Sequence, residues 1–456
     1  MMPGRTNAFL AYAAMIAGTV ALFFLIREWG SGLTAPAAAP TPARTDAASA
    51  SGALTLFHLL LALATVVVAA RVLGAVFRRF RQPPVIGEII AGILLGPSLL
   101  GRLAPAASTF LFPADIVPSL GLIAQIGVVL YMFLVGLELN TALIQKRTHA
   151  TIAVSHASII APFILGSAFA LWLYPRFSSH DVSFTVFALF LGVAMSVTAF
   201  PVLARILTDE QMHTSRLGTI ALACAAVDDV TAWCLLALVV GVVHAEPGRV
   251  VLTLALTACY IAVMIFVVRP IALRLVQVRE HRPPTQGTFA MVCVALLVSA
   301  LTTEAIGIHA LFGAFFLGAV VPHDSSLAQD VKRRLEDVVV VLLLPVFFAI
   351  TGLRTEIGLV SGLVPWLTCG AIILVASIGK LGGAAGAARL AGFPWREALG
   401  LGVLMNTRGL MQLIVLNVGL ELGVLSPTLF AMFILMALAT TLMTAPALHR
   451  LRVAAA

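Results

Sequence analysis

The fold is decided by the stretch Ala225 to Trp233, which reads AAVDDVTAW. It places two adjacent carboxylates, Asp228 and Asp229, inside an apolar run from about Thr214 to Gly241. A run of this length spans a bilayer as one helix. Carboxylates at bilayer depth are energetically costly, and by default they mark the path of an ion or a proton. The stretch therefore predicts a membrane transporter whose substrate meets these two side chains.

The composition places the whole chain in a membrane. Of its 456 residues, 61% are hydrophobic and only 11% are charged, which excludes a soluble globular protein and indicates a polytopic membrane protein surrounded by lipid. The formal net charge of +8 could indicate a nucleic-acid partner. However, the basic residues lie in short clusters between apolar runs, as the positive-inside rule requires, so we expect no nucleic-acid binding.

Apolar segments recur along the chain and predict an all-α fold with 13 to 14 transmembrane helices. The fourteen segments are roughly 8–27, 54–77, 84–101, 117–138, 148–174, 183–207, 214–241, 249–268, 286–303, 306–321, 336–353, 362–388, 397–420 and 426–448. The first could be a signal peptide, but its weak flanks favour a retained extra helix. Residues 29–53 are rich in Ala, Pro, Thr and Ser and read as a disordered linker. We therefore predict an extra helix and linker over 1–53, a membrane domain over 54–450 and a short tail over 451–456.

The distribution of Lys and Arg predicts the orientation. If the N-terminus is cytoplasmic, 19 of the 28 basic residues lie at cytoplasmic ends and six at outer ends. Both termini are therefore expected in the cytoplasm. The remaining three, Arg71, Lys380 and Arg408, lie within apolar segments.

Two segments are interrupted in their middles. Residues 195–201 read MSVTAFP, and Pro201 should break the helix near Thr198, although a simple kink is the alternative. Residues 405–409 read MNTRG, with polar residues at membrane depth. The two segments are seven helices apart, which predicts an inverted repeat of the second to seventh and ninth to fourteenth segments. Paired broken helices in inverted halves indicate a binding site at the membrane midplane.

The carboxylate pair suits an ion that competes with protons. Asp228 and Asp229 point about 100° apart on a helix, so they cannot both face one partner. Water and the unwound backbone near Thr198 would add oxygen ligands for a hard cation such as Na⁺. A site that binds a cation or a proton, never both, is sufficient for an exchanger. The alternative is a hydrogen-bonding site between packed helices.

Two buried cations are expected to support this site. Lys380 needs a carboxylate partner, either Asp228 or Asp229, and the small residues around it allow close helix approach; the alternative is snorkelling to the cytoplasmic surface. Arg408 cannot lose its proton, so we expect it to brace unwound carbonyls. The roles of Glu88, which could be structural or line a gate, and of Arg354 stay open.

Five stretches together match one family. They are 84–97 (PVIGEIIAGILLGP), 133–139 (FLVGLEL), 225–233, 345–349 (PVFFA) and 406–410 (NTRGL). In combination they make the chain resemble the monovalent cation/proton antiporters, in the branch of bacterial sodium/proton exchangers, glutathione-gated potassium efflux systems and plant cation/proton exchangers.

The resemblance implies a homodimer in the cytoplasmic (inner) membrane, with a dimerisation domain and a mobile core that holds two crossed, broken helices. It implies that Asp229 is the essential ion-binding aspartate and that Thr198 lies beside the site. It also implies that Asp228 is the position that is Asp in electrogenic members, and that Lys380 pairs with it. The chain departs from many relatives after Arg408-Gly409, where a glutamate is frequent and this sequence has Leu410, Met411 and Gln412.

These observations predict a secondary antiporter, not an enzyme and without a cofactor, that exchanges Na⁺ or K⁺ for protons in pH and cation homeostasis. We expect electrogenic exchange of two protons for one cation. A cation channel or a non-transporting ion or pH sensor on the same fold is the alternative. An aspartyl protease is excluded, because its two aspartates must face each other across a substrate. The sequence leaves the choice among Na⁺, K⁺ and Li⁺ open.

Overall fold

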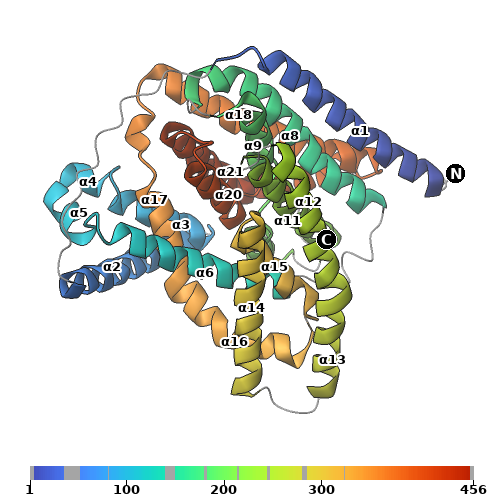
Figure 1. Ribbon diagram of the computed structural model, residues 1–456. Helices are drawn as coiled ribbons and strands as arrows, with labels where there is room; N and C mark the ends of the chain where they lie inside the picture. The colour runs from blue at the N-terminus through green and yellow to red at the C-terminus, as the bar shows by residue number, and fades with distance from the viewer. Residues whose placement is uncertain are drawn as a thin grey trace. The chain divides into compact units, whose positions relative to one another are not determined.

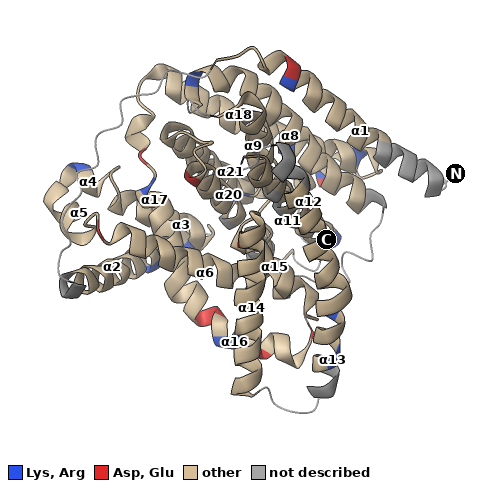
Figure 2. Ribbon diagram, viewed as in Figure 1, with Lys and Arg blue, Asp and Glu red and all other residues tan. Residues whose placement is uncertain are grey.

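The computed structural model describes residues 5–34, 52–80, 82–138, 149–178, 182–212, 215–243, 247–279, 285–322 and 324–451 (Figure 1). Within these residues every regular element is a helix, which confirms the predicted all-α class. Ten of the described helices are long and apolar enough to cross a membrane, and three further apolar helices are shorter. Charged residues are sparse along the ribbon (Figure 2). Most of the predicted linker, residues 35–51, and the tail from 452 onward lie outside the described residues.

The chain divides into two compact units, neither of which is one continuous stretch. Unit 1 consists of Met1–Thr41, Thr148–Ala232 and Val360–Ala456, and unit 2 consists of Pro42–Arg147 and Trp233–Leu359. The membrane domain predicted as one region over 54–450 is thus built from two units. Long-range packing decides this division, so it has no local signal in the sequence.

Unit 1 contains the helices that carry both predicted breaks. They are α1 (Arg5–Gly30), α8 (His149–Phe177), α9 (Phe184–Ser196), α10 (Phe200–Asp209), most of α11 (Arg216–Val243), α18 (Leu363–Leu390), α19 (Trp395–Met405), α20 (Leu410–Glu421) and α21 (Pro427–Leu451). After α1, two sets follow the same order: a long helix, a broken helix and a long helix. The extra helix α1 packs on α8 and α9, with the rings of Phe23 and Phe163 5.9 Å apart.

Unit 2 contains the other helices and the C-terminal turns of α11. They are α2 (Gly52–Arg79), α3 (Pro84–Leu95), α4 (Leu100–Leu103), α5 (Pro105–Leu111), α6 (Val117–Glu138), α12 (Pro247–Val263), the π-helical turn η1 (Met264–Val268), α13 (Arg269–Arg279), α14 (Gln286–Ile306), α15 (Ala310–Val320), α16 (Ser326–Val338), the π-helical turn η2 (Val339–Leu343), α17 (Leu344–Leu353) and the 3₁₀ turn η3 (Ile357–Leu359). Glu88 lies on α3, with its side chain near Gly74 of α2. Arg354 directly follows α17.

Two predicted segment boundaries were wrong, whereas the segment 84–101 agrees with the apolar span Pro84–Leu103, which contains α3 and α4. The segment 249–268 continues through η1 and α13 to Arg279. The segment 336–353 starts ten residues earlier, at α16, where the Ser325 hydroxyl accepts a hydrogen bond from the amide of Ala328. Hydrophobicity marks where a helix can cross a bilayer, whereas capping groups mark where it begins and ends, and the two need not coincide.

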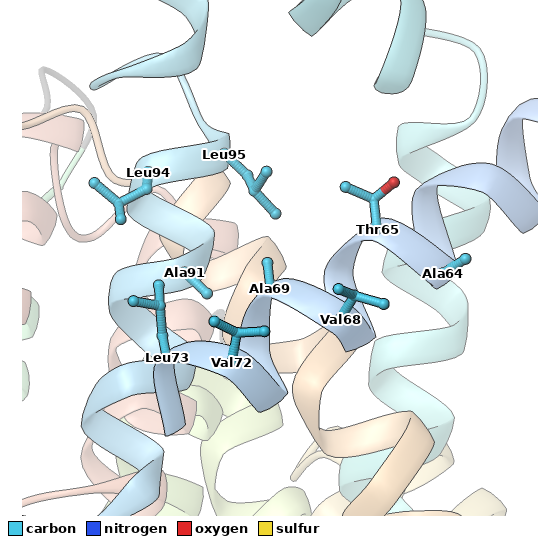
Figure 3. Close-up of a pocket in the computed structure, with 9 residues that line it drawn as sticks. All are labelled: Ala64, Thr65, Val68, Ala69, Val72, Leu73, Ala91, Leu94 and Leu95. Atoms are coloured by element: carbon cyan, nitrogen blue, oxygen red, sulfur yellow. The ribbon is translucent and has the colours of Figure 1, made fainter. Parts of the chain in front are cut away.

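An apolar pocket of about 590 Å³ lies in unit 2, where side chains of α2 and α3 face a common space (Figure 3). Its lining residues are Ala64, Thr65, Val68, Ala69, Val72, Leu73, Ala91, Leu94 and Leu95. One threonine hydroxyl is the only side-chain polar group among them. A dehydrated cation needs several oxygen ligands, so this pocket is unsuitable as an ion site.

Candidate ion-binding site

The two carboxylates lie near the middle of α11, and both are buried, with exposures of 1% for Asp228 and 2% for Asp229. As neighbours on a helix they face different directions. Helix α11 is charged nowhere else between Arg216 and its end at Val243. The two side chains therefore meet different neighbours.

Four donors from the described residues surround the carboxylate of Asp228. The hydroxyl of Ser155 donates to Oδ1 at 3.0 Å, and that of Ser158 lies 2.8 Å from Oδ2. The hydroxyl of Thr198 and the ammonium of Lys380 also reach Oδ2, at 2.8 and 2.9 Å. A buried carboxylate with so many donors is well compensated for the loss of water.

Lys380 reaches this carboxylate from α18 and is fully buried. Its Nζ also donates to the Thr198 hydroxyl at 2.6 Å. Helices α18 and α8 pack closely at Gly379. A side chain at this position would lie only 2.7 Å from the backbone of Pro162 on α8, so the small residue allows the close approach. The ammonium therefore points into unit 1, and the alternative of snorkelling to the surface is wrong for this side chain.

The carboxylate of Asp229 has the opposite surroundings. Both of its oxygens are buried, and neither accepts a hydrogen bond from any residue that the structure describes. The backbone N–H of Phe200, at the start of α10, faces the carboxylate without meeting hydrogen-bond geometry. An unpartnered buried carboxylate is costly, and a bound proton or cation would remove that cost.

Both predicted breaks are present, and they contact each other. The first helix stops at Ser196 and restarts at Phe200, so Pro201 falls in the first turn of α10, where no helical donor is needed. The second leaves Asn406 to Gly409 outside α19 and α20. The amide of Ala199 donates to the carbonyl of Thr407 at 3.0 Å, which joins the two breaks.

Thr198 lies in the first break and contacts the end of the helix before the second break. Its hydroxyl is 2.8 Å from Oδ2 of Asp228 and 3.1 Å from the carbonyl oxygen of Met405, the last residue of α19. A hydroxyl has one hydrogen, so it can donate to only one of these oxygens at a time. The hydroxyl of Thr198 thus connects the carboxylate of Asp228 with the last residue of α19, the first half of the second broken helix.

Arg408, in the second break, reaches the first break with its guanidinium and is 1% exposed. Its Nη1 donates to the carbonyls of Ala194 and Val197, at 3.1 and 3.2 Å, and its Nη2 donates to that of Met195 at 2.7 Å. These carbonyls belong to the last turn of α9 and the residue after it, and a helix end leaves such groups unpaired. The guanidinium therefore occupies the carbonyl end of the first broken helix.

The rest of the second break is fixed by neutral groups. Oε1 of Gln412 accepts a hydrogen bond from Nη1 of Arg408 at 3.0 Å, at the place where many relatives were expected to carry a glutamate. The hydroxyl of Thr441, on α21, donates to the Arg408 carbonyl at 2.6 Å and accepts from its amide at 3.0 Å. Gly409 packs so closely on α10 that any side chain would collide with Val202.

The structure thus brings together Asp228, Thr198 and Lys380, with Asp229 next in sequence and Arg408 bridging the breaks. Sequence reasoning missed Ser155 and Ser158. Their one available signal is a pair of hydroxyl residues three apart in an apolar segment, which places them on one helix face. Such pairs are common in membrane helices, so the signal alone is weak.

Comparisons with known proteins agree with this architecture. A family model for "Sodium/hydrogen exchanger, transmembrane" matches residues 66–451. The Na(+)/H(+) antiporter NhaS4 of Synechocystis is 44% identical over 401 residues, which cover 85% of this chain and 96% of that protein. The K(+)/H(+) antiporter 1 of Saccharomyces cerevisiae is 34% identical over 410 residues, which cover 87% of this chain and 46% of that protein.

Two further matches extend the comparison. Cation/H(+) antiporter 20 of Arabidopsis thaliana is 39% identical over 402 residues, covering 85% of this chain and 48% of that protein; the chain thus spans about half the length of its plant and yeast relatives. The solved structure of the sodium proton antiporter MjNhaP1 from Methanocaldococcus jannaschii matches with a TM-score of 0.62 at 13% identity, over 87% of this chain and 97% of that one, so the fold is shared. By its family model and its relatives, the chain belongs to the sodium/hydrogen exchanger family.

Proposed function

We propose that this protein exchanges a monovalent cation, Na⁺ or K⁺, for protons by alternating access, in the service of pH and cation homeostasis. The observation that carries the proposal is the carboxylate of Asp229, which is buried and unpartnered beside two helix breaks. The relatives of this chain are named Na(+)/H(+), K(+)/H(+) or cation/H(+) antiporters, which supports the same activity for this protein.

Exchange at this site depends on competition. A proton or a cation can neutralise Asp229, and each excludes the other. Unwound backbone near Thr198 would supply further oxygen ligands once the cation sheds its water. Because Arg408 keeps its charge and bonds three carbonyls, it would hold the breaks in register while the ion changes.

We further propose that exchange is electrogenic, with two protons for one cation. One proton would leave Asp229 when the cation binds. The second would come from Asp228 or from Lys380, which share a buried ion pair at 2.9 Å. If Lys380 releases its proton when the cation displaces it from Asp228, the count is the same as for two titrating aspartates.

The assembly and topology that we propose follow the sequence. The protein would be a homodimer in the cytoplasmic membrane, as the resemblance to the antiporter family implies. Both termini would lie inside, because Lys and Arg then concentrate on the cytoplasmic side. The helix over Arg5–Gly30 would precede the antiporter domain over 54–450.

The direct test is exchange in vesicles that contain the purified protein and a pH-sensitive dye. With an acid interior, addition of NaCl or KCl outside should dequench the dye, and LiCl and choline chloride test the ion preference. Dequenching by no alkali cation, from protein shown to be folded in the same vesicles, would contradict the proposed function.

A further inference from the structure

The serines of α8 differ from most hydroxyl residues in the described helices. A buried serine or threonine in a membrane helix commonly donates to a carbonyl one turn earlier in its own helix. Thr231 of α11 and Thr368 of α18 do this, at 2.8 Å in both cases. Ser155 instead donates across the helix interface to Oδ1 of Asp228.

Ser158 has a choice between two acceptors. Its hydroxyl is 2.9 Å from the carbonyl of Ser155 in its own helix and 2.8 Å from Oδ2 of Asp228. Both serines are fully buried. Together they contact both oxygens of one carboxylate, which fixes its orientation in a way that Lys380, bound to Oδ2 alone, cannot.

We propose that Ser155 and Ser158 are positioning residues that hold the carboxylate of Asp228 in one orientation, and that they thereby set the affinity of the site for the transported cation. The inference rests on the proposed function. The two hydroxyls contact both oxygens of the carboxylate and so fix its rotation beside the ion site. Without them the carboxylate would be free to rotate, and the cation would bind less tightly.

Other titratable or charged groups interact with this carboxylate and stay constant in the test. They are Asp229 and Cys224 on α11 and Lys380 on α18. His156, next to Ser155 on α8, bonds the carbonyl of Ile152 in its own helix. A change in KM that appears only when the serines are replaced is therefore assigned to their hydroxyls.

The test compares Ser155→Ala, Ser158→Ala and the double variant in vesicles, with Na⁺ and then K⁺ as the transported ion. At neutral pH we expect the apparent KM for the cation to rise on the order of tenfold for each lost hydroxyl, with the maximal rate largely kept. Ser155→Thr, which keeps a hydroxyl, should restore most of the affinity.

Ser167→Ala is the matched control. Ser167 lies on the same helix and is also fully buried, but its hydroxyl donates to the backbone carbonyl of Ala188. If the double variant keeps the KM of the unmutated protein, or if Ser167→Ala raises the KM by the same factor, the inference is overturned while the proposed function stands. If the unmutated protein exchanges no cation, the proposed function fails and the inference with it.

Discussion

The two faces of α11 at the site give adjacent carboxylates opposite surroundings. Asp228 meets three hydroxyls and an ammonium, whereas Asp229 accepts no hydrogen bond from the described residues. Both are equally buried, and they differ by one position on the helix. The difference shows that burial alone does not define an ion site. What matters is which buried charge the fold leaves for the substrate to neutralise.

This comparison assigns different roles to Asp228 and Asp229. Asp228 is held in place by protein groups, so its bonds contribute to stability and to the geometry of the breaks. The carboxylate of Asp229 accepts no hydrogen bond from the described residues, so its oxygens can bind the proton or the cation. Each of the following predictions tests one side of this division.

The largest expected effect belongs to Asp229→Asn, which should abolish exchange for every cation. The amide keeps the volume of the side chain but loses the charge that binds cation and proton. The protein should stay folded, with a melting temperature no lower than before, since an unpartnered buried charge has been removed. Vesicle dequenching and thermal unfolding in detergent measure both parts, and exchange at the original rate would refute the site assignment.

Lys380→Ala should destabilise the protein, because it leaves Asp228 buried without its counter-ion. Breaking a buried pair typically costs about 3–5 kcal/mol, and three remaining hydroxyl donors place this case near the lower limit. Asp228→Asn combined with Lys380→Ala should cost less than the two single changes together. Thermal or denaturant unfolding of the four proteins gives the coupling, and strictly additive losses would show that the two side chains do not interact.

Electrogenic exchange should make the rate depend on membrane potential. One net charge per cycle corresponds to about 2.3 kcal/mol per 100 mV. We expect the rate of Na⁺-driven exchange to differ between vesicles clamped at zero and at an inside-negative potential with potassium and valinomycin. Asp228→Asn should remove this difference if its carboxylate is needed for the second proton. An unmutated protein that is indifferent to potential, at matched pH gradients, would favour electroneutral exchange.

The smallest effect is expected at an exposed ion pair of unit 2. Nζ of Lys332 lies 2.6 Å from Oε1 of Glu138, closer than Lys380 is to Asp228, but the side chains are 39% and 40% exposed. Exposed pairs contribute about 0–1 kcal/mol. Lys332→Ala should therefore change the free energy of unfolding by less than about 1 kcal/mol. A loss as large as that of Lys380→Ala would show that distance, and not burial, ranks the ion pairs of this protein.

The sequence by itself determined the features that depend on local chemistry. Asp228, Asp229, Lys380 and Arg408 are conspicuous because charge in a long apolar run is costly, whatever surrounds it. The break before Pro201 follows from the missing amide and the steric clash of proline. The lengths of the fourteen apolar segments follow from the thickness of a bilayer. Where a helix begins and ends depends instead on its capping groups, so some helix ends differ from the ends of the apolar segments.

Only the tertiary structure decided which groups meet. The residues alone allowed either aspartate as the partner of Lys380, and only the family resemblance implied Asp228. In the structure, the choice of Asp228 depends on the rotation of α11 against α8 and α18. Ser155 and Ser158 became site residues for the same reason. The two discontinuous units likewise depend on contacts between segments far apart in the chain. Helix rotation and register are set by the sum of many packing contacts, which no short stretch of sequence contains.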